Sequence, residues 1–392
     1  MFKIKQIINQ NSFLKLKEDW NFLLKNSGNR NIFLTWEWLY NWWNYYNEGQ
    51  KLFILVIELN NKIVGIAPFY LKYEKIFGIK IQALRFLGDV EVCSEQLDLI
   101  THPDYLNEIY TAVLEYLHKF KNEWDYLFLT DFKKNSNFIK WLGEYTNSKK
   151  FKNIIKEITV NPYLTIPTNW ETYFNSLSRN QRKHYRRDSN RLENTFKVRF
   201  EVFSDNHDIT LEEAMSSLII LHEKRWIQDS GVGVFSRKRF REFHNTIAKS
   251  FFNQGWLRLF LLRIDGSIKA ALYTFEYDKI LFGYQMGYDP NLSEYSIGRL
   301  MILWSVKYAI ESNLDEYDFL RGRSMYKYQF TNDIRNNVSI FVSQNNFRGY
   351  LVFCYSQITS NIKSISKTLT PSGIWNYLHK KKYLRKMRSQ LY

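Results

Sequence analysis

Cysteine is almost absent from this 392-residue chain, which has only Cys93 and Cys354. Two isolated cysteines exclude a disulfide framework and a zinc cluster, and they are typical of a reducing compartment. The seven histidines form no HExxH or HxH pair, so the sequence predicts no metal site. The motifs GxGxxG, GxxxxGK[ST] and GxSxG are also missing, which argues against dinucleotide redox chemistry, nucleotide hydrolysis and a serine nucleophile.

Long apolar runs are missing as well. The best run, residues 52–57, is far shorter than the roughly 18 residues of a membrane-spanning helix, and the N-terminus lacks the apolar block of a signal peptide. By contrast, 45% of the residues are apolar and 18% are aromatic, which is enough to fill the cores of two domains. We therefore expect a folded, cytoplasmic protein that can also act at the inner face of the membrane.

The net charge of +16 is concentrated in two short segments. Residues 179–191 (RNQRKHYRRDSNR) carry six basic residues against one acid, and residues 380–388 carry six with no acid. Such clusters suit phosphate on a nucleotide-linked sugar, a coenzyme, a tRNA or an anionic membrane surface. A solvated helix face and a frayed basic tail are the alternative explanation.

Hydrophobic patterning shows one order of elements twice, with hairpin turns at Asn60-Asn61 and Asp265-Gly266. The first copy comprises helices at 12–26 and 35–46, strands at 52–59, 62–71 and 79–87, a helix at 104–120 and a strand at 124–129. The second comprises helices at 209–229 and 236–253, strands at 255–264, 267–277 and 279–288, a helix at 296–312 and a strand at 316–320. Agreement in order and spacing predicts an internal duplication.

The duplication predicts an α/β (α+β) fold with two tandem lobes, each a mixed, mostly antiparallel sheet flanked by helices. We place the first lobe at residues 1–160 and the second at 196–345. Between them we expect a linker with Pro162 and Pro167 and a long basic helix, together spanning residues 161–195. Residues 346–392 are predicted to form a C-terminal helix and a basic tail.

A strand-to-helix crossing, GYQMGYDPNLSEYSIGRLMILW, is the strongest local candidate for ligand binding. Its helix should begin near Ser296, where backbone N–H groups without helical partners bind anions such as pyrophosphate. Gly298 would let a ligand approach closely, and Arg299 would add positive charge. An ordinary capped helix is the alternative.

Six segments carry a resemblance to a known family: FLTWEWLYNWW, SLSRNQRKHYRR, LHEKRW, AALYTF, GYDPNLSEYSIGRLMI and YDFLRGRSMYKYQF. Together they resemble the Acetyltransf_6 group of the GNAT superfamily, which includes CelD-like acetyltransferases and is similar to the Fem-type peptidoglycan transferases. The resemblance covers roughly residues 15–345. It implies two GNAT-like lobes, with the donor site in the second and the acceptor bordered by the first.

The resemblance also implies roles for individual residues. The acyl donor would lie along residues 282–288, which include Met286 and Gly287, with its phosphates at residues 296–299. The loop shows only SIGRL rather than the full GNAT pattern, so the donor stays open between acyl-CoA, with acetyl-CoA favoured, and the aminoacyl-tRNA of Fem-type enzymes. Tyr326 and Lys327 look like the Fem-type FKxxF segment. There Lys327 would stabilise the oxyanion of acyl transfer, unless it is one more exposed lysine.

The candidates for the acceptor side of the site are residues whose side chains could act as a base, bind an anion or stack on a sugar. Asp318 and His222 are candidate general bases, with ion pairing and core packing as their respective alternatives. Arg225 would grip a phosphate or carboxylate, beside Trp226 on the same helix. Trp38 belongs to a tryptophan cluster that could stack on sugars, although helical spacing favours packing for part of that cluster.

Three functions follow from these observations. The first is an acyl-CoA-dependent N- or O-acyltransferase that acts on a cell-surface polysaccharide or a nucleotide-sugar precursor. The second is a Fem-type, aminoacyl-tRNA-dependent transferase that adds amino acids to a cell-wall precursor, with tRNA bound by the basic helix. The third is a non-catalytic protein that binds nucleic acid or a membrane surface through its basic segments.

Overall fold

The first lobe is built around a meander of antiparallel strands, as the hairpin signals predict. The computed structural model describes residues 2–89, 92–149, 151–204, 208–229, 231–322 and 326–369. The elements of this lobe are β1 (Lys3–Ile7), α1 (Gln10–Lys15), α2 (Lys17–Asn26), α3 (Trp36–Tyr46), β2 (Gln50–Leu59), β3 (Lys62–Ile76), β4 (Ile79–Phe86), β5 (Ile100–Thr101), α4 (Leu106–Lys119), β6 (Tyr126–Lys133) and α5 (Asn137–Ser148). Strands β1 to β4 are antiparallel, and β6 returns parallel to β4.

Local sequence explains the first elements of this lobe. Asn60 and Asn61 both adopt the left-handed conformation, with φ of 50° and 61°, which asparagine tolerates and the β2–β3 turn requires. Thr35 caps α3 by accepting a hydrogen bond from the Trp38 N–H. Both features confirm the predicted helix and hairpin.

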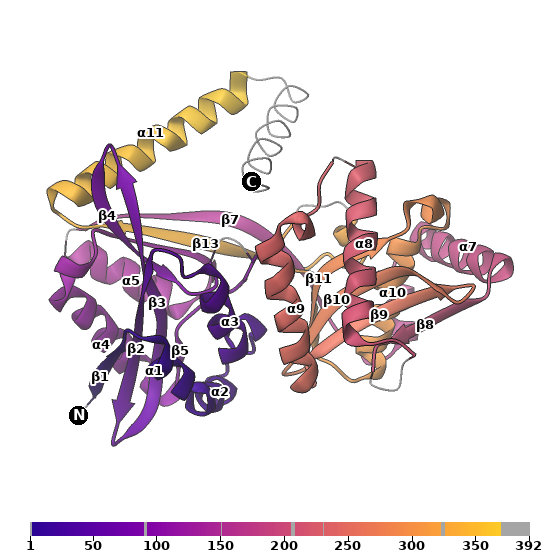
Figure 1. Cartoon of the computed structure of the whole chain (residues 1–392), viewed down its shortest axis with the longest axis horizontal. Coiled ribbons are helices and arrows are strands. Elements are labelled where there is room, and N and C mark those ends of the chain that lie inside the picture. The colour runs from indigo at the N-terminus through magenta and orange to yellow at the C-terminus, as the bar shows by residue number, and fades with distance from the viewer. Residues whose placement is uncertain are drawn as a thin grey trace.

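The second lobe repeats this order. Its elements are α6 (Trp170–Ser176), α7 (Arg179–Thr195), β8 (Val198–Val202), α8 (Leu211–Asp229), α9 (Lys238–Asn253), β9 (Leu257–Ile264), β10 (Ser267–Tyr277), β11 (Ile280–Tyr288), α10 (Ile297–Glu311) and β12 (Glu316–Asp318). Strands β8 to β11 are antiparallel, and β12 returns parallel to β11, as β6 does to β4. The duplicated α/β fold is therefore confirmed, with the lobes side by side in Figure 1.

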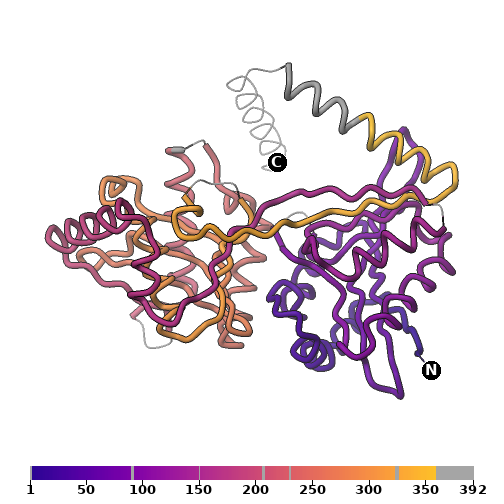
Figure 2. The backbone as a smooth tube through the Cα atoms, turned by 180° about the vertical axis from the view of Figure 1, so that it is seen from behind, coloured from indigo at the N-terminus to yellow at the C-terminus, as the bar shows by residue number. Residues whose placement is uncertain are grey.

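Two long strands, β7 (Lys152–Thr165) and β13 (Ile334–Ser343), join the lobes into one thirteen-stranded sheet. They pair with each other, while β7 also pairs with β12 of the second lobe and β13 pairs with β6 of the first. Figure 2 shows both strands running between the lobes. The predicted boundaries were therefore wrong, because residues 161–165 form a strand rather than a linker and residues 334–343 complete the sheet of the first lobe.

Pro162 misled that prediction, because proline cannot donate to a sheet ladder and usually marks a strand edge or a loop. Here its carbonyl accepts the Phe319 N–H at 3.0 Å, and the next N–H, from Tyr163, bonds to the Asp333 carbonyl at 3.1 Å. The strand therefore continues through Pro162 without an unsatisfied donor.

The predicted single helix from 170 to 194 is two helices. Leu177 is extended, with ψ of 149°, and Ser178 starts a new helix through a reciprocal capping box with Gln181. The basic residues of the first cluster therefore all lie on one regular helix, α7.

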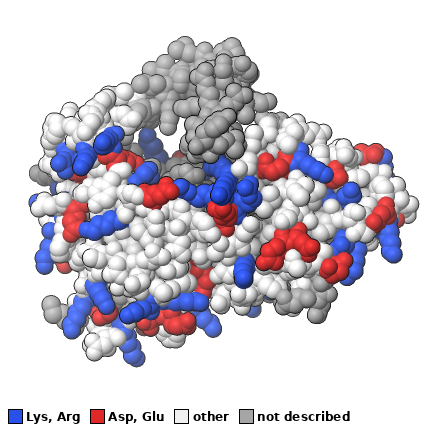
Figure 3. All heavy atoms as spheres, in the orientation of Figure 1, with Lys and Arg blue, Asp and Glu red and all other residues white. Residues whose placement is uncertain are grey.

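The last described element is α11 (Phe347–Leu369), which leaves the end of β13 beside the first lobe (Figure 1). The basic segment 380–388 lies outside the described residues. No helix in the described part of the chain is long and apolar enough to cross a membrane. On the face seen in Figure 3, basic and acidic side chains are interspersed over both lobes.

Candidate active site

A gap between strands opens beside β11 in the second lobe. β12 pairs with β11 only at residues 280–282, and β12 ends at Asp318. Among the described residues no other strand pairs with that edge of β11, so the backbone of residues 283–288 has an open side. Since sheet edges present unpaired N–H and C=O groups, this edge can bind an extended ligand.

A β-bulge decides which side chains of β11 border the gap. The register with β10 shifts between Tyr273 and Thr274, which leaves Tyr284 as an extra residue on β11. Before the bulge, Phe282 packs with α8 and α9; after it, Met286 and Tyr288 pack with α10. The extra residue changes the alternation of faces, as bulges do, and so turns two side chains toward the start of α10.

A cavity of about 290 Å³ lies where β11 ends and α10 begins. It is lined by Arg225, Met286, Tyr288, Ser293, Ser296, Ile297, Gly298, Arg299, Tyr326, Gln329 and Phe330. These residues come from α8, β11, the turn before α10, the first turn of α10, and the short helix at residues 327–329. Three stretches distant in sequence, at residues 225, 286–299 and 326–330, therefore meet at one helix N-terminus.

The start of α10 offers backbone donors to this cavity. Ser296 is left-handed, with φ of 52°, and its carbonyl accepts the N–H groups of Arg299 and Leu300. The N–H groups of Ile297 and Gly298 have no protein partner among the described residues. Unpaired N–H groups and the positive end of a helix dipole favour an anion.

Two guanidinium groups flank these donors. Arg299 is held by Asp188, at 3.3 Å, and by the Ser296 hydroxyl, at 2.9 Å. Arg225 donates to the Met286 carbonyl at 3.2 Å and lies over the Tyr288 ring, 5.3 Å from its centroid. Both cations are thus fixed in place by the protein before any ligand arrives, which lowers the entropic cost of binding an anion.

Gly298 keeps the cavity open. A Cβ atom at this position would lie 3.1 Å from Cε1 of Tyr288 and 3.3 Å from Cε of Met286. A larger side chain would therefore project onto the cavity wall beside the unpaired N–H groups. Only glycine lets an anion approach the backbone this closely.

Tyr326 forms part of the opposite wall. Burial raises the pKa of its hydroxyl, and the nearby Arg225 opposes that rise. The phenol consequently stays protonated at neutral pH and can donate a hydrogen bond or a proton within the cavity.

Comparison with known proteins shows which family the second lobe matches. Residues 179–328 match the family described as an acetyltransferase (GNAT) domain. The matched range begins with α7 and ends in the short helix at 327–329, so it contains all the residues that line the cavity except Gln329 and Phe330. The second lobe therefore contains a GNAT-type domain.

Solved structures extend the likeness to both lobes. The crystal structure of FemX matches with a TM-score of 0.60 at 12% identity, covering 88% of this chain and 98% of that chain. A conserved protein of unknown function from Bacteroides thetaiotaomicron VPI-5482 matches with a TM-score of 0.52 at 13% identity, covering 87% and 100%. Identities this low show a shared fold alone. No curated protein sequence gives a significant match.

The GNAT domain brings six predicted site residues together. Met286, Ser296, Gly298, Arg299, Arg225 and Tyr326 all line the cavity. Their roles in binding stay predictions, although their proximity follows from the fold. Tyr288 belongs to the range 282–288 that was predicted to border the donor, but it was not singled out, because the bulge that turns it toward α10 leaves no mark in the hydrophobic pattern. Gln329 was not predicted.

Gly287, predicted to contact the donor, faces the other way. A Cβ atom there would lie 2.3 Å from the backbone nitrogen of His222 and 2.8 Å from the Leu218 carbonyl oxygen. The glycine therefore lets β11 pack directly against the backbone of α8. Its neighbours Met286 and Tyr288, not Gly287 itself, contact the cavity.

Lys327, the predicted oxyanion group of the GNAT domain, is occupied elsewhere. Its ammonium donates to the carbonyls of Phe319 at 2.6 Å, Leu320 at 3.0 Å and Arg321 at 2.7 Å. All three protons are thus used to cap the end of β12, and burial lowers the pKa of the ammonium to about 8. This geometry corrects the catalytic assignment, because no donor remains for a substrate.

Asp318, a predicted general base, is fully buried between the lobes. Its carboxylate accepts from Gln96 at 2.6 Å, Arg335 at 2.5 Å and the Leu320 N–H at 2.8 Å. It is therefore a structural acceptor that joins β12 to the first lobe. The alternative of a structural ion pair had Arg321 or Arg323 as the expected partner, whereas the structure pairs Asp318 with Arg335.

The same interface holds a second buried carboxylate, Glu95 of the first lobe, which is 1% exposed. It accepts from the Arg321 backbone N–H at 2.9 Å and from the guanidinium at 2.5 Å, and it also accepts from Asn161 and Asn337. Arg321 further bonds to Asp131 at 2.8 Å. Burial raises the pKa of Glu95 to about 7, even though Arg321 lowers it.

His222 and Trp226 form a pair on α8 rather than a catalytic base and a substrate platform. The Trp226 indole N–H donates to His222 Nε2 at 3.0 Å, and the His222 ring is fully buried against Phe235. Neither residue lines the cavity. His222 is thus turned toward the core and Trp226 toward His222, whereas Arg225 on the same helix lines the cavity.

Trp38, predicted to contact a sugar, is fully buried in the first lobe's interface with α9. Its indole N–H donates to the Ser94 hydroxyl at 2.8 Å, and its ring packs edge-on against Phe243 and stacks on Phe251. No face is left for a sugar, so the packing alternative is confirmed.

Proposed function

We propose that this protein transfers an acyl group from acyl-CoA, acetyl-CoA in the first place, to an amine or hydroxyl of a phosphate-bearing saccharide. The acceptor would be a cell-surface polysaccharide or its nucleotide-linked precursor. One observation carries the proposal. The unpaired N–H groups of Ile297 and Gly298 meet the guanidinium groups of Arg225 and Arg299 in one cavity, directly beside the open edge of β11.

Each part of the cavity suits one part of the donor. The N–H groups and the two arginines would bind the pyrophosphate, since both charge and hydrogen-bond geometry favour it. The open edge of β11 would pair with the amides of the pantetheine arm, as a sheet edge pairs with an added strand. The cavity that Gly298 keeps open fits this arrangement, because a side chain there would occupy the space of the phosphates.

Transfer from such a donor is a single displacement at the thioester carbonyl. The acceptor nitrogen or oxygen forms a bond to this carbon and gives up one proton to water, the C–S bond breaks, and the sulfur leaves as a thiolate that takes up one proton. Tyr326 is our candidate for the proton donor, because it lines the cavity and its raised pKa keeps it protonated.

The surface beside the cavity supports a phosphate-bearing acceptor. Helix α7 packs against the turn before α10, where Arg191 pairs with Glu294. Three further cations of this helix, Arg179, Lys183 and Arg186, are exposed to solvent. A row of exposed cations next to a transferase site attracts anionic substrates.

The same surface favours a second candidate donor, aminoacyl-tRNA. FemX shares the fold over both lobes. In this chain Gln181 of the basic helix donates to the Gln329 carbonyl at 2.8 Å, so α7 adjoins the cavity wall directly. Phosphate contacts dominate nucleic-acid binding, and the exposed cations of α7 would supply them.

Titration with each donor separates the candidates. We expect acetyl-CoA and coenzyme A to raise the unfolding temperature of the full chain, since a ligand at a hundred times its Kd stabilises the folded state by about 2.7 kcal/mol. Charged tRNA should give no comparable shift. Stabilisation by charged tRNA alone would transfer the proposal to the second candidate. Stabilisation by neither donor would contradict both and favour a binding protein without transferase activity.

A further inference from the structure

Helix α11 is apolar on two opposite sides. Val352 is buried on the first lobe beside Ile76 and Ile81, as the inner side of a surface helix should be. The outer side nevertheless carries large apolar side chains: Phe347 is 71% exposed, Tyr350 57% and Ile358 54%. Tyr355, one turn from Val352, is still 40% exposed. A helix that is apolar on both sides requires a second apolar contact.

The tip of the β3–β4 hairpin extends this outer side. The hairpin projects to α11 in Figure 1, and Phe77 at its tip is 77% exposed. The Phe77 ring meets the Tyr355 ring edge-on, with centroids 5.8 Å apart. We call the resulting surface the docking face; it consists of Phe77, Phe347, Tyr350, Tyr355 and Ile358.

Exposed apolar residues are common singly, but several of them on one helix and on the hairpin tip that meets it mark an interaction site. The position of Phe77 strengthens that conclusion. It holds a left-handed φ of 49°, which a bulky residue adopts only at a cost, where asparagine or glycine would fit better. The chain thus keeps a large ring at a turn position that local conformation disfavours.

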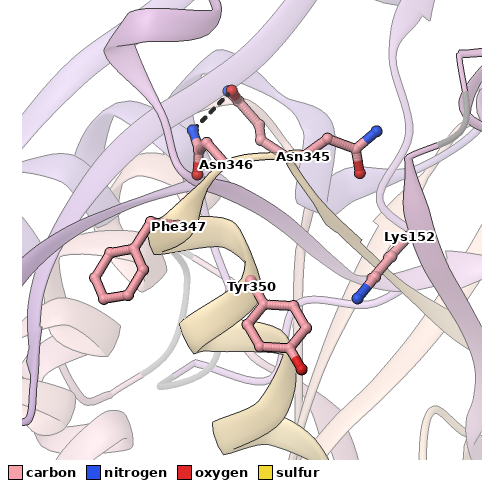
Figure 4. A pocket seen from close by; sticks show the side chains of 6 residues that line it. Lys152, Asn345, Asn346, Phe347 and Tyr350 are labelled. Atoms are coloured by element: carbon pink, nitrogen blue, oxygen red, sulfur yellow. Dashed lines mark hydrogen bonds between the residues drawn. The ribbon is translucent and has the colours of Figure 1, made fainter.

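The docking face is bordered by cations. Lys75 and Lys80 are exposed on either side of Phe77. The Lys152 ammonium lies 4.4 Å from the centroid of the Tyr350 ring. Figure 4 shows Lys152 reaching toward Tyr350, while Phe347 extends from the preceding turn of α11. Lys152 therefore lies over one ring of the docking face, and Lys75 and Lys80 flank another.

The sequence that follows has the same character. Residues 345–392 contain nine lysines and arginines and no acidic residue. An apolar surface flanked by cations, with a strongly basic segment beyond it, is complementary to a surface that is apolar inside and anionic outside. Nucleic acid offers the negative charge but no apolar layer for Phe77 and Ile358.

We propose that the docking face binds the surface of an anionic phospholipid bilayer, with its apolar side chains inserted between the acyl chains and its cations on the headgroups. This binding is independent of the acyl donor, because the cavity lies in the other lobe. It would hold the protein at the membrane while leaving the GNAT cavity free.

Vesicle co-sedimentation tests this proposal with the full chain. We expect binding to vesicles that contain phosphatidylglycerol, weak binding to pure phosphatidylcholine, and weaker binding as salt is added, because added ions screen the lipid charge. The double substitution Phe77→Asn and Ile358→Ser should lower the partition coefficient roughly tenfold or more, since both residues would insert into the bilayer. Asparagine suits the left-handed turn, and both positions are exposed, so the variant should keep its fold.

The matched control is Phe22→Ser, which removes a ring that is 72% exposed on α2, away from the docking face. It should bind vesicles as the unaltered chain does. Equal binding to both kinds of vesicle, no binding at all, or full binding by the Phe77→Asn, Ile358→Ser variant would each overturn the proposal. A second result would also overturn the proposal: removal of residues 370–392 abolishes binding while the double variant still binds fully. The tail alone would then bind the vesicles.

Discussion

Replacing Gly298 by valine should weaken coenzyme A binding at least about tenfold, a loss of roughly 1.4 kcal/mol, while the chain stays folded. The substitution adds methyl groups where even a Cβ atom lies only 3.1 Å from Tyr288. The methyl groups would project into the space beside the unpaired N–H groups of Ile297 and Gly298. Phosphate could then no longer reach these donors.

Isothermal titration of coenzyme A into the two proteins measures the effect. Gly143→Val is the matched control, because Gly143 is also a helical glycine and a Cβ atom there would make an ordinary 3.6 Å contact with Ile155 in the first lobe. This control should bind coenzyme A unchanged. A Gly298→Val variant with the affinity of the unaltered chain would show that the donor phosphates lie elsewhere.

The second large effect concerns the interface between the lobes. Arg321→Met should lower the free energy of unfolding by about 3–5 kcal/mol, the usual cost of leaving buried charges without their partner. Arg321 is the cation that contacts both Glu95 and Asp131, and both carboxylates are almost fully buried. Denaturant unfolding followed by fluorescence measures the change.

The loss of unfolding free energy caused by Arg321→Met should also depend on pH. Burial raises the pKa of Glu95 to about 7 and raises that of Asp131, while Arg321 lowers both, so its removal raises them further. A carboxyl group with a raised folded-state pKa stabilises the fold at low pH and loses that contribution as pH rises through this pKa. The variant should therefore lose more stability at about pH 8 than at about pH 6.

An exposed arginine provides the comparison. Arg199 pairs with Glu201 at 2.8 Å, but its side chain is 73% exposed. Arg199→Met should cost less than about 1 kcal/mol, as surface pairs do, with little dependence on pH. If Arg321→Met lowers the free energy of unfolding by no more than this, the contacts of Arg321 with Glu95 and Asp131 do not hold the lobes together.

The sequence predicted the parts of the fold that local rules determine. Asn60-Asn61 and Asp265-Gly266 marked two hairpin turns, Thr35 marked a helix start, and the repeated order of elements revealed the duplication. The exchange of β7 and β13 between the lobes could not be read in this way. It depends on pairing between strands about 180 residues apart, and Pro162 obscured even the existence of β7.

In the candidate site, too, the residues that could be predicted are those that local sequence places. Ser296, Gly298 and Arg299 belong to one helix start, so local reasoning places them together. Lys327 and Asp318 were misjudged because their roles are set by partners across the fold. Three backbone carbonyls use every proton of the lysine, and Gln96 and Arg335 occupy the carboxylate. Both the catalytic and the structural readings of these residues were compatible with the sequence.

Hydrogen–deuterium exchange with and without acetyl-CoA tests the central claim most directly, because it reports on backbone N–H groups themselves. The account predicts that the donor slows exchange in peptides covering residues 283–300, where the open edge of β11 and the start of α10 lie. Peptides of the first lobe should be unaffected. Protection confined to the first lobe, or none in residues 283–300 at saturating acetyl-CoA, would contradict a donor site in this cavity.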